Sequence, residues 1–206
     1  LLLECLGLGA RITAGRVYGL LPENVEIEEL PLAQSDPFDG RLGPMAYFER
    51  LSLTDFRATE HTGGAWREDE QHVAASLGLL AHVVELDRDE RRSDTPVLTR
   101  LSFDILGTMP VGDVGTTVRV LRPGRTIELV EARMSHDGRD AVVLRAWLQT
   151  TGDTTGVAGT SIAPLPAPGE FPAWSPTAAW PGGFIKSVTV HQDHIEPGRA
   201  RFWART

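Results

Sequence analysis

QHVAASLGLLAHVVEL, residues 71–86, is the stretch that decides the fold, because it carries the strongest helical pattern of the chain. One set of apolar residues recurs at the spacing of a helix face: Val73, Leu77, Leu80 and Val84. A second apolar stripe runs beside it: Leu79, Val83 and Leu86. A helix that is apolar on two sides is mostly buried. We therefore predict a buried helix, ended by the charged run Asp87–Asp94 and by Pro96.

The residues that follow alternate as strands do. VLTRLSFDIL places one set on a single face: Val97, Thr99, Leu101, Phe103 and Ile105. VGTTVRVL does the same with Val114, Thr116, Val118 and Val120. In TIELVEARM the alternation of apolar and polar residues is interrupted at Leu129-Val130, which are both apolar. This interruption predicts a β-bulge there. DAVVLRAWLQ, residues 140–149, is nearly continuously apolar, which predicts a strand inside the sheet and covered on both faces.

Turn residues join these strands. Arg122–Arg125 reads RPGR, with Pro-Gly in the centre of a tight turn, and Asp137-Gly138 is typical of a hairpin. Extended residues between Tyr47 and Glu60, with a turn near Leu53–Asp55, precede the helix. The order is strand, buried helix, then four strands. The simplest solution is an α+β fold in which a curved antiparallel sheet wraps one helix. We expect this domain to span residues 45–150 and residues 1–44 to form an N-terminal extension.

Charge and composition restrict the partners. The formal net charge of −8 argues against nucleic acid and anionic membrane, which both need a basic face. The first apolar stretch is short, is broken by Glu4 and follows no basic residue, so it predicts neither a signal peptide nor a membrane span. Cys5 is the single cysteine, which predicts a reducing, cytoplasmic location. The scattered histidines do not suggest a metal site.

In order, the segments FRATEHTGGAW, QHVAASLGLLAHVVE, RLSFDILGTMPVG and VRVLRPGRTIELVEARMSHDGRDAVVLRAWLQ resemble acyl-CoA thioesterase-like proteins. The likeness is to the N-terminal hotdog domain of the acyl-CoA thioesterase II type, which has two hotdogs in one chain. It covers roughly Met45 to Thr150. The resemblance implies a hotdog fold and a protein that hydrolyses or binds acyl-CoA thioesters. It implies no cofactor, since coenzyme A is part of the substrate.

The C-terminal residues extend this resemblance. Residues 151–183 are rich in Gly, Pro, Thr and Ala and predict a linker. Residues 184–206 resemble the first strands of a second, incomplete hotdog, with strands at Phe184–Gln192 and Ala200–Thr206 around a Glu196–Arg199 turn. The family's water-positioning Asp, Ser or Thr, and Gln belong to segments of that second hotdog expected after Thr206. None of these three family residues can therefore be assigned to a position in this sequence.

Weaker catalytic candidates lie near the helix. Successive helical residues turn by about 100°, so one polar stripe collects Gln71, Gly78, His82 and Glu85. His82 or Glu85 could serve as a base, or the stripe could face solvent or another subunit. His72, expected in the first helical turn, falls where related single hotdogs often carry a His-Gly-Gly, but Val73-Ala74 follow it here, so the close approach that the glycines allow is lost. His61 could face the same crevice or be a hydrogen-bonded structural residue.

Two further groups are candidates for substrate binding. Gly63-Gly64 could leave room for a thioester beside the helix start, where backbone N–H groups point outward, or could form a plain bend with Trp66 as a core plug. Arg122 and Arg125 could hold the phosphates of coenzyme A, or be exposed hairpin residues. Rival functions remain open: a non-catalytic acyl-CoA or acyl-carrier binding module, or a structural partner half. Because hotdogs usually pair edge to edge, we predict a homo-oligomer.

Overall fold

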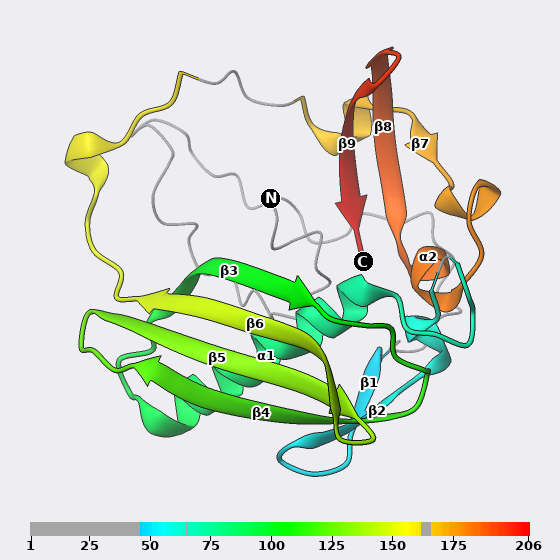
Figure 1. Cartoon of the computed structure of the whole chain (residues 1–206). Coiled ribbons are helices and arrows are strands. Elements are labelled where there is room, and N and C mark those ends of the chain that lie inside the picture. Colours follow the sequence, from blue (N-terminus) through cyan, green and yellow to red (C-terminus); the bar gives the residue numbers. More distant parts are fainter. Residues whose placement is uncertain (1–45, 65, 162–165) are drawn as a thin grey trace. The chain divides into compact units, whose positions relative to one another are not determined.

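One long helix lies along a face of a six-stranded antiparallel sheet (Figure 1). The structure is a computed structural model that describes residues 46–64, 66–161 and 166–206. Helix α1 spans Val73–Arg91. The sheet is made of β1 (Phe48–Arg50), β2 (Asp55–Ala58), β3 (Val97–Ile105), β4 (Asp113–Arg122), β5 (Ile127–His136) and β6 (Arg139–Gln149). Its order is β1-β2-β4-β5-β6-β3. This architecture confirms the predicted α+β class.

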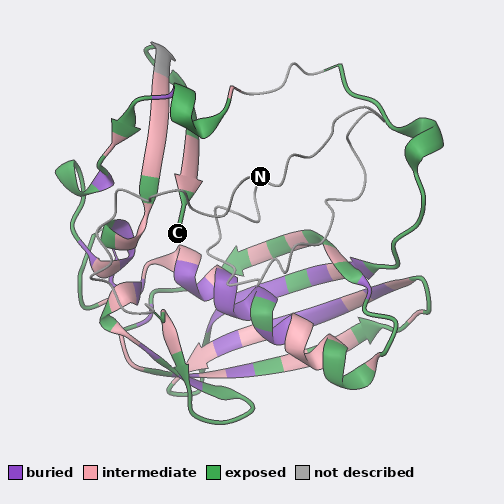
Figure 2. Cartoon of the chain, turned by 180° about the vertical axis from the view of Figure 1, so that it is seen from behind, coloured by how far each residue is buried: buried purple, intermediate pink, exposed green. Residues whose placement is uncertain are grey.

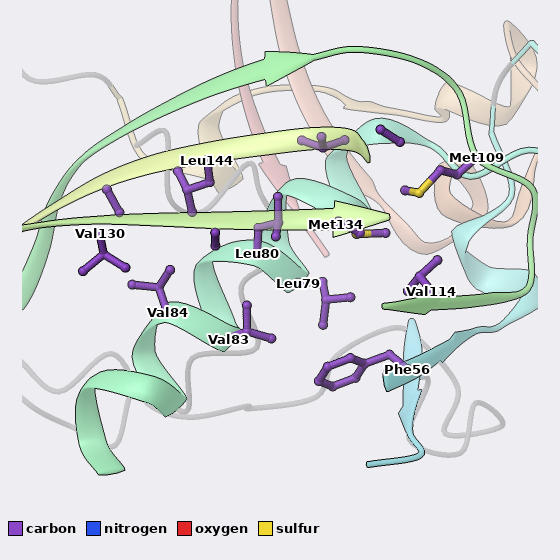
Figure 3. Close-up of a cluster of buried hydrophobic side chains, with 14 of the residues drawn as sticks. Phe56, Leu79, Leu80, Val83, Val84, Met109, Val114, Val130, Met134 and Leu144 are labelled. Atoms are coloured by element: carbon purple, nitrogen blue, oxygen red, sulfur yellow. The ribbon is translucent and has the colours of Figure 1, made fainter. Parts of the chain in front are cut away.

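The apolar face of α1 packs against the middle of the sheet (Figure 3). Leu80 and Val84 are fully buried, and on the sheet side so are Val130 and Leu144. Burying a side chain of this size contributes about 1.5–3 kcal/mol, so this layer is the main source of stability of the domain. Figure 2 shows the buried residues gathered along the helix and the strands beneath it. The prediction of a buried helix is confirmed.

The limits of α1 differ from those expected. The helix begins at Val73, with His72 as the N-cap. It continues through the charged run that was predicted to end it and stops at Arg91. The reason is the spacing of the charges: Asp87 and Arg91 are four residues apart and form an ion pair of 2.7 Å. Such pairs stabilise a helix, so α1 extends into the charged run and ends within it, five residues before Pro96.

Strand β3 has a register shift that the alternation did not reveal. The pairing with β6 is irregular between Leu98 and Arg100, so Thr99 is an extra residue. Before this bulge the faces are exchanged: Val97 is exposed, and Leu98 packs against the core together with Leu101 and Phe103. The predicted common face was therefore wrong for Val97 and Thr99, because one inserted residue reverses the side-chain direction.

Both predicted hairpins are present. Asp137 and Gly138 have φ angles of 48° and 74°, as a tight turn between β5 and β6 requires. The bulge expected at Leu129-Val130 lies instead in the partner strand, at Leu121, where the β4–β5 register shifts. β6 lies inside the sheet as predicted, but its outer face is not fully covered, since Arg145 is exposed. Arg145 already interrupts the apolar run in the sequence, and in the structure it lies 3.6 Å from the carboxylate of Glu131 on the neighbouring strand.

The C-terminal residues form shorter elements. A second antiparallel sheet has the order β7-β8-β9. The elements are β7 (Ala173–Trp174), β8 (Thr189–Glu196), β9 (Arg199–Arg205), helix α2 (Gly183–Ser187), and the 3-10 helices η2 (Glu60–Thr62), η3 (Thr155–Val157), η4 (Pro168–Glu170) and η5 (Pro176–Ala178). The strand predicted from Phe184 is wrong in its first half, which is helical. The N-terminal extension predicted for residues 1–44 lies outside the described residues. No helix of the described residues is long and apolar enough to span a membrane.

Candidate functional site

Gly63 and Gly64 form the corner that leads from η2 to the start of α1. The N–H of Gly64 donates to the carbonyl oxygen of Glu70 at 2.7 Å, and Gly63 forms a bridge with Gln71. The N–H of His72 donates to the carbonyl oxygen of Thr62 at 2.6 Å. The loop is thus closed on itself by backbone hydrogen bonds, and the predicted bend is confirmed.

The backbone that closely approaches this corner is the chain's own. The N–H of Phe184 donates to the carbonyl oxygen of Gly63 at 3.1 Å. A Cβ atom on Gly182 would lie 2.7 Å from that same oxygen, and one on Gly183 would overlap the carbonyl of Glu60. Only glycine fits where two backbones meet so closely. Two glycine pairs, Gly63-Gly64 and Gly182-Gly183, therefore face one another.

His72 is half-buried and contacts the same segment. Its ring stacks on that of Phe184, with centroids 4.2 Å apart and 11° between the planes. Nδ1 accepts a hydrogen bond of 3.2 Å from the N–H of Ala74, which caps α1. Burial lowers the pKa of His72, so the imidazole is neutral at neutral pH and carries its proton on Nε2. His72 can then offer an N–H to a ligand, whereas its lone pair is already used by the cap.

The predicted polar stripe of α1 is split. Gln71 is buried just before the helix, where Nε2 donates to the carbonyl oxygen of Pro110 at 2.8 Å. Gly78 is also buried, whereas His82 is exposed, and Glu85 forms an ion pair of 3.8 Å with Arg88. His82 lies ten residues beyond His72, or about 15 Å along the helix. The structure does not bring His82 or Glu85 to the glycine corner.

The loop after the corner turns Trp66 outward. This side chain is 94% exposed, so the interpretation of Trp66 as a core plug was wrong. The loop is held by its backbone, because the N–H of Val111 donates to the carbonyl oxygen of Asp69 at 2.9 Å. At the glycine corner itself the close neighbours are Gly182–Phe184, from far along the chain. His61 lies in η2 and is half-buried.

Arg122 and Arg125 lie beside the opposite end of α1. Arg92, which follows the helix, donates to the carbonyl oxygens of Gly124 at 2.9 Å and Arg125 at 2.7 Å. The guanidinium of Arg122 donates to the carbonyl oxygen of Ile127 at 3.0 Å, across the turn. Since α1 has 19 residues, about 27 Å of helix separate this hairpin from the glycine corner. The two groups of predicted binding residues are therefore not brought together.

A buried carboxylate that the sequence interpretation missed fixes this end of the helix. Glu128 is 4% exposed and accepts a hydrogen bond of 2.9 Å from Arg91, while Arg92 lies 3.6 Å away. Its position in the strand alternation was a usable signal, because Glu128 shares the inner face of β5 with Val130 and Ala132. A charge at a core position requires partners, and the end of α1 supplies them.

In the part of the chain that the structure describes, no three His, Cys, Asp or Glu side chains group as metal ligands would.

Comparisons with known proteins agree with this architecture. The family model described as the acyl-CoA thioesterase N-terminal domain matches residues 62–149. A candidate thioesterase from Novosphingobium aromaticivorans DSM 12444 has a similar structure: 18% identity over 78% of this chain and 65% of that chain, with a TM-score of 0.60. A conserved protein of unknown function with a hot dog fold from Alicyclobacillus acidocaldarius shares 11% identity over 71% of this chain and 53% of that chain, with a TM-score of 0.52. No curated protein matches the chain.

These likenesses define a class. At such identities the solved structures show the fold alone, and that fold is the hotdog. The match of residues 62–149 makes the chain thioesterase-like over the unit that runs from η2 through α1 to the end of β6.

Proposed function

We propose that the chain belongs to an acyl-CoA thioesterase of the double-hotdog type and binds acyl-CoA with the thioester beside the start of α1. The observation that carries this proposal is the match to the acyl-CoA thioesterase N-terminal domain, which coincides with one helix-and-sheet unit. No cofactor is proposed besides the coenzyme A that the substrate carries.

The chemistry expected beside α1 is binding and orientation. Thioester hydrolysis needs an activated water and donors for the developing oxyanion. The N–H groups at the helix start and the Nε2–H of His72 are hydrogen-bond donors of the kind that a developing oxyanion requires. A base is harder to place, because Nδ1 of His72 caps the helix and His82 is about 15 Å away along α1. We therefore assign water activation to the second hotdog, as the family resemblance implies.

The sheet β7-β8-β9 supports this division. β8 and β9 follow the Pro- and Gly-rich segment, whereas β7 lies within its last part, and we propose that these strands belong to the second hotdog. Three strands bury little by themselves, so such a sheet is expected to pack against further elements.

A second candidate function is favoured by the placement of the histidines. With the lone pair of His72 used in the helix cap, the first hotdog could be a non-catalytic acyl-CoA or acyl-carrier binding module, or the structural partner half of an assembly. Binding without turnover is the behaviour that separates this candidate from a hydrolase.

One experiment tests both candidates. The protein is titrated with octanoyl-CoA by calorimetry, and thiol release is followed with a chromogenic thiol reagent, against a blank for Cys5. For residues 1–206 we expect octanoyl-CoA to bind more tightly than free coenzyme A, with slow or no thiol release, because water activation is assigned to the second hotdog. Failure of octanoyl-CoA to bind would refute the proposed function. Rapid turnover would instead refute the division between hotdogs, and Glu85→Gln and His82→Ala would then be assayed first.

A further inference from the structure

The face of the sheet opposite α1 contains a buried carboxylate. Val130 and Ala132 are fully buried on the inner face of β5, so Glu131 between them points to the other side. A side chain on that face would ordinarily reach water, yet Glu131 is only 3% exposed. Charged groups are rarely buried unless they are paired, so its surroundings require an explanation.

Three arginines cover this carboxylate. Oε1 of Glu131 accepts hydrogen bonds from Arg119 at 3.1 Å and Arg133 at 2.9 Å, and Nε of Arg145 lies 3.6 Å from Oε2. The strand register explains the grouping, because Arg119, Glu131 and Arg145 are direct neighbours across β4, β5 and β6. The three arginine side chains are 69%, 42% and 59% exposed, against 4% for Glu131. The guanidinium groups are therefore the outer layer.

This arrangement leaves positive charge at the surface. Arg133 also pairs with Asp140 at 2.6 Å, so three cations stand against two carboxylates. On β3, Arg100 and Asp104 share the same face and cancel in formal charge. This local excess of one positive charge contrasts with the net charge of −8 of the whole chain.

The cluster also has space and unused donors. A shallow hollow is lined by Thr117, Val118, Arg119, Glu131 and Arg133. Each guanidinium has five N–H groups, and Arg119 directs one nitrogen at Glu131. Burial raises the pKa of Glu131, but Arg133 and Arg119 outweigh that effect and lower it, so the carboxylate stays ionised and holds the guanidinium groups together.

We propose that Arg119, Arg133 and Arg145 form a phosphate-binding site on the outer face of the sheet, with Glu131 as the residue that positions them. Guanidinium groups match the oxygens of phosphate in bidentate fashion, and two of them converging from neighbouring strands fit one tetrahedral anion. The ligand is free phosphate or the phosphomonoester of a nucleotide. This site does not depend on the proposed thioester site, because α1 covers the opposite face of the sheet.

The test is a calorimetric titration with inorganic phosphate and, separately, with adenosine 3′,5′-bisphosphate, each against sodium chloride at equal ionic strength. Wild type is expected to bind both phosphates saturably. Tighter binding of the bisphosphate would identify a nucleotide as the source, and equal affinities would identify the free anion. Arg119→Gln/Arg145→Gln should weaken binding by about tenfold. Arg57→Gln/Arg67→Gln, a control that removes two exposed arginines paired with carboxylates elsewhere on the chain, should bind as wild type does.

A milder variant separates binding from folding, because the double substitution leaves Glu131 with fewer partners. Arg145→Gln keeps both hydrogen bonds that Glu131 accepts and is expected to fold normally, with phosphate affinity reduced by about threefold. If the arginines only neutralise Glu131, the double variant loses stability while Arg145→Gln binds phosphate as wild type does. That result, or a wild type that responds to phosphate no more than to chloride, would overturn the proposal.

Discussion

The ring of His72 stacks on the ring of Phe184, with 4.2 Å between the centroids. This contact joins the cap of α1 to α2, a helix within the residues where the sequence predicted the end of a linker and the start of a strand. Ala75 and Ile185 pack in the same cluster, and Tyr47 hydrogen-bonds Ser187. A ligand beside the start of α1 would therefore meet Phe184 as a neighbour, so the segment after the predicted linker contributes to the candidate site.

The first prediction concerns the meeting of the two glycine pairs. In Gly183→Ala, the added methyl group would overlap the carbonyl oxygen of Glu60, and moving the backbone should cost about 1–3 kcal/mol of unfolding free energy. Gly169→Ala is the matched control, because a Cβ there has no neighbour within 4 Å, and it should change stability by less than about 0.5 kcal/mol. Urea denaturation measures both. Equal midpoints for the two variants would show that this contact does not hold the segment.

The second prediction uses the lowered pKa of His72. Burial disfavours the imidazolium, so the unfolded chain binds the proton more readily than the folded one. Stability from the neutral ring is complete above the unfolded pKa of about 6.5 and is lost as the pH falls through that value toward the lower folded pKa. His72→Asn keeps an N-cap side chain but does not titrate. It should reduce stability by about 0.5–1.5 kcal/mol through loss of the stacking.

The decisive readout for His72 is the pH dependence. Urea midpoints of the wild type should decrease between pH 8 and pH 5 more steeply than those of His72→Asn. An identical slope in wild type and His72→Asn would contradict the assignment of a half-buried, neutral His72.

The elements that could be predicted from sequence are those fixed by local periodicity. The spacing of Leu80 and Val84 identified the buried face of α1, and Asp137-Gly138 identified a hairpin, since each signal lies within a few residues. Errors arose where one residue changed the register, as Thr99 does in β3. Alternation is read from side chains, whereas a bulge is decided by how two strands pair, which the sequence of one strand does not contain.

The candidate site was less predictable because distant residues complete it. Gly63-Gly64 was recognised as a place of close backbone approach, and a ligand was one interpretation. The backbone that approaches it in the structure is Gly182-Phe184, separated from it in sequence by the whole helix and sheet. No local pattern joins these segments. Trp66 was also misplaced, since its side chain is exposed and does not belong to the core.

The third prediction concerns assembly. β3 is an edge strand of the six-stranded sheet, and it presents the exposed apolar side chains Val97 and Ile105. Open edges invite pairing with another chain, so we expect a homodimer or larger assembly that buries β3. Ile105→Lys should shift the assembly toward monomer, since a charge at the edge opposes pairing. Leu53→Lys, at the exposed β1–β2 turn, should not. Light scattering at micromolar concentration measures both, and a monomeric wild type would contradict the prediction.

The last prediction concerns Arg122 and Arg125 as a binding site for the phosphates of acyl-CoA. Arg122→Ala/Arg125→Ala should weaken acyl-CoA binding about tenfold at low salt, since exposed charge contacts contribute about 0.2–1 kcal/mol each and 1.4 kcal/mol corresponds to a factor of ten. The difference should shrink at high salt, because exposed charges are screened over about 10 Å at 0.1 M. Arg92 holds the turn through the backbone oxygens of Gly124 and Arg125, so the hairpin should keep its shape in the variant.

The matched control for the Arg122 and Arg125 experiment is Arg199→Ala/Arg201→Ala, which removes two exposed arginines from the β8–β9 hairpin and should leave affinity unchanged. Calorimetry with octanoyl-CoA at two salt concentrations compares the three proteins. The geometry makes the test stringent, because about 27 Å of helix separate this hairpin from the glycine corner and one ligand would have to extend along α1 to reach both. Equal affinity of wild type and Arg122→Ala/Arg125→Ala at low salt would mean that the pair is only a solvated turn, with the phosphates bound elsewhere.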